Sequence, residues 1–150
     1  MKIGIISDTH GLLRPEVLAA LEGCEAILHA GDIGGDAILA GLRRIAPVHA
    51  VRGNCDGSWA RALPWTEHRE LGGLGFYLIH DLAELDLDPS AAGVSVVVSG
   101  HSHQPKIAWQ GGVLYLNPGS AGPRRFTLPI ALARLELGPG GLEPEIVTLG

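Results

Sequence analysis

The sequence has little cysteine, only Cys24 and Cys55 in a chain of 150 residues. Two cysteines do not build the disulfide framework that holds many small secreted domains together, and their spacing is unlike that of a zinc knuckle. In a cytosolic protein, two such thiols are normally free. The cysteine content therefore argues against a disulfide scaffold.

Long apolar runs are also missing. No stretch approaches the roughly 18 apolar residues that a membrane helix needs. The first residues, MKIGIISDTHG, contain Lys2 and an apolar run that Asp8 and His10 soon interrupt, so this run is too short for the core of a signal peptide. We therefore expect a cytoplasmic protein that does not enter a membrane.

The chain also lacks an excess of positive charge. The chain has 11 Lys and Arg against 16 Asp and Glu, a formal net charge of −5. Proteins that bind long nucleic acids normally carry a basic patch, so we expect no such partner; a small phosphorylated substrate at a local positive centre stays compatible with this charge. With 46% hydrophobic and 18% charged residues, residues 1–150 are expected to form one globular domain.

Short apolar runs alternate with helical patterns in the first half of the chain. The runs cover residues 3–6, 26–30 and 48–52, and this alternation is typical of parallel strands buried on both faces. Five further strands are expected at 75–80, 94–100, 112–119, 131–137 and 145–149. Because antiparallel hairpins come late, after the βα units, they predict a second sheet packed on the first. The expected fold class is α/β, with two packed β-sheets flanked by helices in a four-layer α/β/β/α sandwich.

Polar side chains follow most of these strands at the point where each strand ends. They are Asp8, His10, Asp32, Asn54, His80, His101 and His103. Ligands of open α/β sheets bind outside the carboxyl ends of the strands, so we expect the seven side chains to converge at one edge. Taken singly, any of them could instead be a cap or turn residue.

The chemistry of these side chains points to metal ions. Two carboxylates, one amide oxygen and four imidazoles suit Mn, Fe, Co, Ni or Zn better than a thiolate-rich structural zinc site does. Seven ligands are too many for one ion, whereas two ions that share a carboxylate would use them well. A glycine precedes three of the ligands or ligand pairs, at Gly31, Gly53 and Gly100, where it would let the backbone approach the ions closely.

The blocks DTH, GD, GNCD, a strand-end His and GHSH follow one another in the order seen in the calcineurin-like metallophosphoesterases, which the chain resembles. The string NPGS at 117–120 and the short length resemble the YfcE-type phosphodiesterases. The resemblance implies a first metal ion at Asp8, His10, Asp32 and His103 and a second at Asp32, Asn54, His80 and His101. Mn²⁺ is the preferred ion, with Ni²⁺, Co²⁺, Fe²⁺ and Zn²⁺ as alternatives. The resemblance also implies that Asp32, Asn54 and His80 take part in catalysis. In this mechanism the two ions activate a hydroxide, which attacks a small phosphodiester.

Three residues near Asn54 are candidate substrate contacts. Cys55 stands where many members of the superfamily carry a His that is thought to protonate the leaving group, which leaves the general acid open. Asp56 is either a turn residue or a partner that orients a ligand. Arg52 could reach a phosphate or form a structural salt bridge. His29, inside an apolar strand, is expected to be a core histidine.

A rival hypothesis is a non-catalytic scaffold. The resemblance extends to a metallophosphoesterase-fold retromer subunit that is thought to work as an interaction module. That subunit departs from the motif at the Asn position, where this chain keeps Asn54, so the complete ligand set favours an enzyme. A nuclease or phosphomonoesterase is a third reading. The oligomeric state stays open, and a homo-oligomer is compatible with the sequence.

Overall fold

The first sheet is built on the three early apolar runs, which form parallel strands. The computed structural model describes residues 1–149. β1 (Lys2–Ile6) lies at the centre and pairs in parallel with β2 (Ala26–His29), which pairs in parallel with β3 (Val48–Ala50). On the other side of β1, β9 (Ala131–Gly138) and β10 (Gly141–Thr148) complete the order β10-β9-β1-β2-β3.

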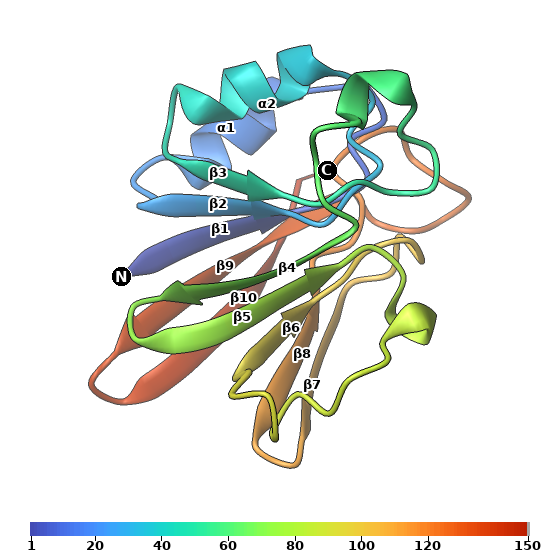
Figure 1. The fold of residues 1–150 in the computed structure, drawn as a ribbon. Coiled ribbons are helices and arrows are strands. Elements are labelled where there is room, and N and C mark those ends of the chain that lie inside the picture. The colour runs from blue at the N-terminus through green and yellow to red at the C-terminus, as the bar shows by residue number, and fades with distance from the viewer. Residues whose placement is uncertain (150) are drawn as a thin grey trace.

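Two helices connect the parallel strands and cover the outer face of this sheet (Figure 1). α1 (Pro15–Leu21) begins with Pro15, whose missing N–H would have no partner in the first turn anyway, and buries Val17 and Leu21. α2 (Asp36–Arg43) buries its apolar stripe against the same face. The helical patterns predicted from the sequence are confirmed.

The second sheet has the order β4-β5-β6-β8-β7. Its inner strands β5 (Leu74–Ile79), β6 (Val96–Val98) and β8 (Val113–Asn117) run parallel. The edge strands β4 (Thr66–Leu71) and β7 (Lys106–Gln110) are antiparallel to their neighbours. A short 3₁₀ turn, η1 (Ser58–Ala60), lies in the chain between the two sheets.

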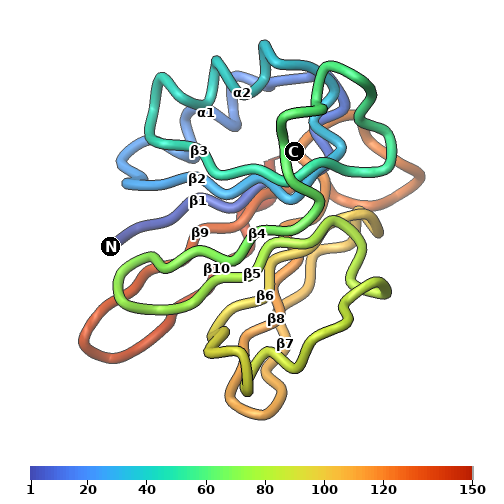
Figure 2. Tube along the Cα trace, in the orientation of Figure 1, coloured from blue at the N-terminus to red at the C-terminus, as the bar shows by residue number. Residues whose placement is uncertain are grey.

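The two sheets pack face to face, as Figures 1 and 2 show, and the predicted fold class is confirmed. Ile5 and Leu28 of the first sheet lie in one buried cluster with Phe76 and Val96 of the second. Burial of each such side chain contributes about 1.5–3 kcal/mol. The outer face of the second sheet is covered by the segment that carries the 3₁₀ turn η2 (Leu82–Glu84), so the fourth layer contains one helical turn and irregular chain with turns.

One feature of the predicted topology is wrong. The last hairpin, β9–β10, was expected with the second sheet but extends the first, because β9 pairs antiparallel with β1, with Ile5 opposite Ala133. Edge strand β7 was not predicted, since its exposed pattern lacks a clear alternation. Within residues 1–149, the helices are too short and not apolar enough to cross a membrane.

Candidate metal centre

The loops after β1, β2, β5 and β6 bring five of the seven expected ligands together. Three groups have ligand atoms that all lie within 4.8 Å of one another: Asp8 with His10 and His103, Asp8 with Asp32 and His80, and His10 with Asp32 and Cys55. The two carboxylates thus connect imidazoles from both sheets. This is the arrangement that two neighbouring ions with shared ligands require.

The spacing of the donor atoms fits metal coordination. His80 Nε2 lies 3.2 Å from Asp32 Oδ2, and His103 Nε2 lies 3.3 Å from Asp8 Oδ1. His10 Nε2 lies 3.7 Å from Asp8 Oδ1 and 3.8 Å from Asp32 Oδ2. Two ligand atoms that each lie about 2.1 Å from one ion are about 3.0–3.4 Å apart at octahedral or tetrahedral angles. The distances of 3.2 and 3.3 Å lie within that range, and those of 3.7 and 3.8 Å slightly exceed it.

Four polar atoms of the cluster are buried and have no hydrogen-bond partner in the structure: Asp8 Oδ1, His10 Nε2, His80 Nε2 and His103 Nδ1. A buried polar atom without a partner costs about 1–3 kcal/mol. Divalent cations would satisfy an oxygen and two Nε2 atoms of this set. The residues therefore fit bound metal ions.

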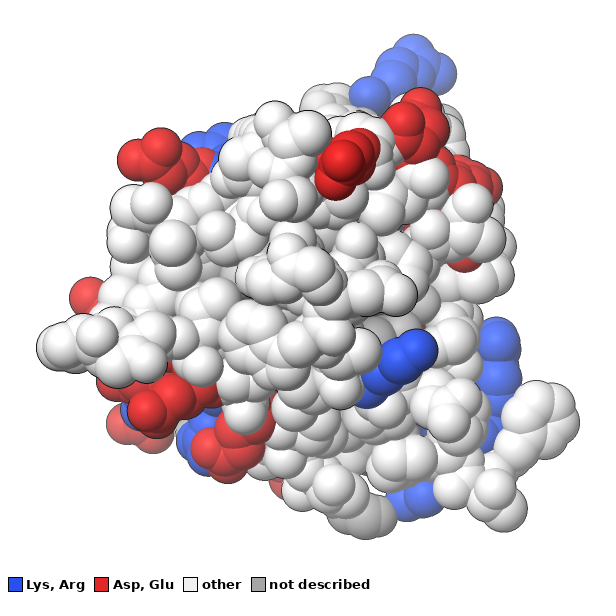
Figure 3. Space-filling view, turned by 90° about the horizontal axis from the view of Figure 1, so that it is seen from below, with Lys and Arg blue, Asp and Glu red and all other residues white. Residues whose placement is uncertain are grey.

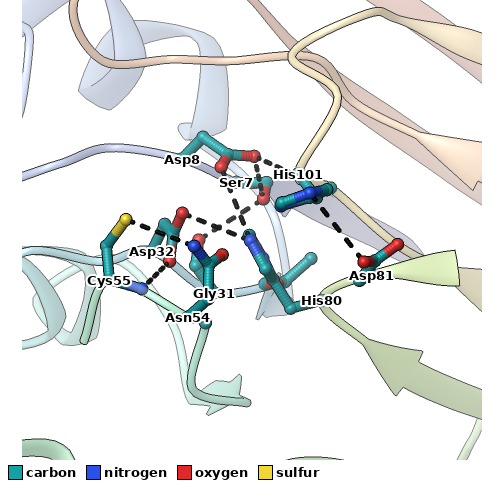
Figure 4. Close-up of polar contacts among 12 residues, drawn as sticks. Ser7, Asp8, Gly31, Asp32, Asn54, Cys55, His80, Asp81 and His101 are labelled. Atoms are coloured by element: carbon teal, nitrogen blue, oxygen red, sulfur yellow. Dashed lines mark hydrogen bonds and ion pairs between the residues drawn. The ribbon is translucent and has the colours of Figure 1, made fainter. Parts of the chain in front are cut away.

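Each carboxylate uses one oxygen to anchor itself and presents the other. Asp8 Oδ2 accepts hydrogen bonds from the Ser7 hydroxyl at 2.7 Å and the His101 N–H at 3.1 Å. Asp32 Oδ1 accepts one from the Cys55 N–H at 2.8 Å (Figure 4). Asp8 Oδ1 and Asp32 Oδ2 then face the imidazoles. The backbone thereby holds both carboxylates in a fixed direction before any ion binds.

His80 is held in a direction that suits a ligand. Its Nδ1 lies 2.8 Å from the carbonyl oxygen of Ala30. Because this oxygen can only accept, Nδ1 carries the proton and donates the hydrogen bond. The lone pair of a neutral ring then lies on Nε2, which faces Asp32. A metal-ligating histidine is commonly oriented by such a hydrogen bond from the ring nitrogen that does not bind the metal.

The electrostatics keep both carboxylates ionised. Burial by itself raises the pKa of Asp8, but the attraction of the nearby His10 and His103 rings and the hydrogen bond from Ser7 outweigh it and hold this pKa well below its ordinary value. Burial likewise raises the pKa of Asp32, and interactions with His80 and the Cys55 N–H more than reverse this. Asp8 raises the pKa of His10, against the effect of burial. Two charged carboxylates at neutral pH are what a cation site needs.

The backbone at the ligands is unusual. Six residues other than glycine have positive φ within residues 1–149, and five are candidate ligands: Asp8 (56°), His10 (45°), Asp32 (55°), His101 (71°) and His103 (62°). A left-handed backbone is strained for such residues and tends to occur at functional sites, where the surroundings hold it in place. The strain is therefore concentrated at the proposed metal centre.

Two of the glycines that precede ligands have no room for a side chain. A Cβ on Gly100 would lie 2.0 Å from Ser7 Oγ, and one on Gly53 would lie 2.1 Å from Asp32 Oδ1. These glycines therefore allow the backbone to approach the side chains of Ser7 and Asp32 closely. The loops after β3 and β6 can touch the two carboxylates only because these positions are glycine.

His101 and Asn54 lie at the margin of the cluster. The His101 ring packs edge-on against His80 with centroids 5.2 Å apart, but its Nε2 faces Asp81 Oδ2 at 3.8 Å (Figure 4). The Asn54 amide lies 3.5 Å from Cys55 Sγ. Both side chains border the centre, beside the ligand His80.

Cys55 lies closer to the centre than its sequence position alone indicated. Its Sγ groups with His10 and Asp32, and the thiol is free and exposed. Partial desolvation of the sulfur and the nearby Asp32 carboxylate raise the pKa of the thiol. The thiol is therefore protonated at neutral pH in the metal-free protein.

The structure favours a supporting function for Asp56. Its carboxylate accepts hydrogen bonds from the N–H groups of Ile33, Gly34 and Gly53, at 2.9–3.2 Å, and is buried. It thus ties the loop after β2 to the loop after β3, and both oxygens are occupied by backbone donors. The alternative of an orienting partner is supported over direct substrate contact.

Arg52 stands beside the centre. Its guanidinium carbon lies 4.2 Å from the centroid of the Trp65 ring, and one of its nitrogens donates to the carbonyl oxygen of Asp56 at 3.3 Å. It lines a small cavity together with Asn54 and His80. This position is compatible with a phosphate contact, and in place of the alternative, a structural salt bridge, the guanidinium stacks on Trp65.

His29 is a core histidine, as expected, but it also connects two ligand loops. Its Nδ1 accepts a hydrogen bond from the Gly31 N–H at 3.1 Å. The ring proton therefore lies on Nε2, which donates a hydrogen bond to Thr9 Oγ1 at 3.0 Å. The Thr9 hydroxyl in turn donates to the carbonyl oxygen of Ile33 at 2.7 Å. The histidine holds the loop that carries Asp8 and His10 against the loop that carries Asp32. The sequence contained no signal for this function beyond the position of His29 at a strand end.

The NPGS segment also braces the ligand loops. The Asn117 amide donates to the carbonyl oxygen of Gly100 at 3.0 Å and to Ser102 Oγ at 3.1 Å, which supports the turn between His101 and His103. Ser120 Oγ donates to the carbonyl oxygen of Asp8 at 3.0 Å. These side chains thus support the ligand loops from behind, and Asn117 also lines the cavity beside His101.

Known proteins resemble this chain in sequence. Residues 1–139 match the family model for the calcineurin-like phosphoesterase superfamily domain. A probable metallophosphoesterase of Methanothermobacter thermautotrophicus is 36% identical over an alignment that covers 100% of this chain and 94% of that protein.

Solved structures show the same fold. An archaeal phosphodiesterase superposes with a TM-score of 0.81 at 24% identity, over 98% of this chain and all of that one. The phosphoesterase Yfce of Escherichia coli gives 0.72 at 23% identity, and full coverage of both chains. Vps29 of Entamoeba histolytica, in a complex with zinc, gives 0.75 at 26% identity, again over both full chains.

Proposed function

Because the chain belongs to the calcineurin-like phosphoesterase superfamily, we propose that it is a phosphodiesterase that hydrolyses small phosphodiesters with two divalent metal ions. The observation that carries this proposal is the set of buried, unpartnered atoms at Asp8, His10 and His80. Mn²⁺ is the proposed ion, and Ni²⁺, Co²⁺, Fe²⁺ and Zn²⁺ are substitutes that accept the same nitrogen and oxygen ligands.

The proposed ligand sets share one carboxylate. Asp8, His10, Asp32 and His103 would hold one ion, and Asp32, Asn54, His80 and His101 the other. When bound, two such ions lower the pKa of a water molecule and polarise the phosphoryl oxygens. The protein fixes the direction of its ligands: Ser7 and the His101 N–H anchor Asp8, the Cys55 N–H anchors Asp32, and the carbonyl of Ala30 orients His80.

The chain has no evident general acid to protonate the leaving group. Cys55 offers a thiol, where many relatives are expected to carry an imidazole. General acid catalysis typically contributes about 10²–10⁴-fold, mostly for poor leaving groups. We therefore propose activated diesters as the best substrates for measuring activity.

The first test is removal of the metal. Protein treated with a chelator should lose hydrolysis of an activated aryl phosphodiester, and Mn²⁺ should restore it. Asp32→Ala should reduce the restored rate by at least about 10³-fold, because it removes a ligand of both ions. The control variant His68→Ala changes an exposed residue on β4 and should keep the rate of the wild type. Equal losses in the two variants, or full activity in the stripped protein, would overturn the proposal.

The second candidate function is a binding scaffold without activity. The similarity to Vps29 over the full chain supports it. A scaffold would bind metal and yet show no turnover with any phosphodiester in the presence of each of the five metal ions. The complete ligand set, Asn54 included, and the unpartnered ligand atoms are the features on which the proposal of an enzyme rests.

We further propose that the substrate is small and that the protein works in the cytoplasm. Figure 3 shows a face on which the Lys and Arg side chains of the described residues are scattered and most of the surface is uncharged. This face therefore carries no continuous basic track of the kind that binds a long nucleic acid. Both cysteines are free thiols, which is compatible with a reducing compartment.

A further inference from the structure

A third group of ligand atoms lies at the metal centre, beside the two sets proposed above. It consists of the His10 imidazole, the Asp32 carboxylate and the Cys55 thiol, whose ligand atoms all lie within 4.8 Å of one another. Neither of the two proposed ions uses the sulfur. Imidazole, carboxylate and thiolate all bind zinc-like ions, and three protein ligands with one open position form a common tetrahedral site.

The loop after β3 places Cys55 at this group. The Cys55 N–H donates to Asp32 Oδ1 at 2.8 Å, and the Asn54 amide donates to Cys55 Sγ at 3.5 Å. Figure 4 shows Cys55 next to Asp32, on the side of the cluster that lies away from Asp81. The thiol is free and exposed, so an ion from the solvent reaches it without any opening of the protein.

The distances suit a thiolate-bound ion after a small movement of one side chain. Bonds of about 2.3 Å to sulfur and about 2.0–2.2 Å to nitrogen or oxygen separate the sulfur from each other ligand atom by about 3.6 Å at a tetrahedral ion. His10 Nε2 and Asp32 Oδ2 are already 3.8 Å apart. The sulfur stands at the end of an exposed side chain with one rotatable bond, so it approaches the other two atoms without movement of the backbone.

His10 is the ligand that both arrangements need. Its Nε2 is buried and has no hydrogen-bond partner, and it lies 3.7 Å from Asp8 Oδ1 and 3.8 Å from Asp32 Oδ2. The ring therefore stands midway between the set that contains Asp8 and the set that contains Cys55. Because this nitrogen has one lone pair and binds one ion, it cannot serve both sets at once.

The type of ligand selects the ion. Mn²⁺ suits carboxylate, carbonyl and water ligands, whereas a thiolate selects softer, thiophilic ions. The Cys55 thiol loses its proton to water as the bond between sulfur and metal forms, and nothing is oxidised or reduced. Cys55 thus gives the centre a ligand that the proposed Mn²⁺ pair leaves unused and that a thiophilic ion prefers.

We propose that His10, Asp32 and Cys55 form an alternative site for a thiophilic divalent cation, which inhibits the protein by withdrawing His10 and Asp32 from the proposed Mn²⁺ pair. The binding part of this inference is independent of any catalytic activity. The inhibition part rests on the proposed phosphodiesterase function.

Cd²⁺ is the probe for binding, because a bond between cadmium and a thiolate gives a charge-transfer band in the ultraviolet. Addition of Cd²⁺ to the reduced, metal-free protein should produce this band. Cys55→Ser should abolish it, and Cys24→Ala, which removes the other, buried thiol, should keep it. A band that is absent from the wild type, or that persists in Cys55→Ser, would overturn the proposal.

A second variant separates a three-ligand site from a lone thiol. His10→Gly removes the imidazole and keeps the left-handed backbone of this position, which glycine adopts without strain. The Kd for Cd²⁺, followed by the same band, should rise by at least about tenfold, because loss of even an outer partner of a ligand costs about 10–100-fold in affinity. Equal Kd values in the wild type and His10→Gly would mean that the thiol binds Cd²⁺ alone and that the site is wrong.

Inhibition is measured on the Mn²⁺-loaded protein with the activated aryl phosphodiester. Half-inhibition by Cd²⁺ should need a concentration at least about tenfold lower in the wild type than in Cys55→Ser, each relative to its own rate without Cd²⁺. Equal inhibition of the two would overturn the inhibitory effect. If no ester is hydrolysed but the band depends on Cys55 and His10, the thiolate site stands and the phosphodiesterase function fails.

Discussion

Single residues at the metal centre adopt a backbone that their side chains disfavour. His10 has a φ of 45° and Asp32 a φ of 55°, and both stay in place because neighbouring loops hold them. The His10 N–H donates to the carbonyl oxygen of Asp32 at 3.0 Å, and the Asp8 N–H donates to that of Gly31 at 3.0 Å. The left-handed conformation, which costs free energy, is thus held in place by neighbouring loops at the positions that set the direction of the ligands.

This strain predicts an unusual order of stability. His10→Gly should be more stable than His10→Ala by about 1 kcal/mol, because only glycine adopts positive φ without a steric penalty. The free energy of unfolding of both variants is measured by urea denaturation in the presence of a chelator. The order should reverse at His68, on strand β4, where glycine weakens an extended backbone. A His10→Ala variant at least as stable as His10→Gly would show that the left-handed conformation is not strained.

At the scale of elements, His29 connects the ends of β1 and β2. Its ring is fully buried, and burial lowers its pKa to about 4 against the ordinary value of 6.5. A proton on Nδ1 would also abolish the hydrogen bond from the Gly31 N–H. The neutral ring is therefore the form that holds the two loops together.

This histidine predicts a loss of stability in acid. The unfolded chain binds a proton at His29 below pH 6.5 and the folded chain only below about 4, so its contribution is complete above pH 6.5 and is lost as the pH falls toward 4. Between pH 7 and 4.5, the wild type should lose about 2 kcal/mol more stability than His29→Gln, which has no such proton. Urea denaturation of the chelator-treated proteins at both pH values measures the difference. Parallel losses would show that His29 does not resist protonation.

At the scale of the whole molecule, the metal centre joins the two sheets. Asp8, His10 and Asp32 come from the loops of the first sheet, and His80 and His103 from those of the second. Elsewhere the sheets meet through apolar packing. Metal ions bound at this place would oppose separation of the two sheets and would stabilise the folded chain as a whole.

The melting temperature should therefore rise with metal. Mn²⁺ at 100 times its dissociation constant adds about 2.7 kcal/mol for one site, or about 5–10 °C for a chain of this size. Asp32→Ala should remove most of this shift in a calorimetric scan. Asp36→Ala, at an exposed carboxylate in the first turn of α2, should keep it. A full shift in Asp32→Ala would place the bound metal elsewhere.

Much of the site could be read from local pattern. The chain showed buried strands by their short apolar runs, and parallel strands end at a common edge, so Asp8, Asp32, His80 and His103 could be expected to meet. Glycine at 53 and 100 indicated close approach, and the structure has the carboxylates in contact with those positions. These features depend on residue type and order, which the sequence contains in full.

Other features depend on partners that lie far apart in the chain. Alternation identified β9 as a strand but not β1 as its neighbour, because a strand edge offers the same N–H and C=O groups to any partner. The choice of backbone donors by Asp56, the link from His29 to Thr9, and the cavity beside His101 likewise arise only when the loops pack. The sequence by itself determined which groups could bind metal and where their strands end. The tertiary structure decided which of those groups point inward, since direction is set by hydrogen bonds and packing between segments as much as 112 residues apart.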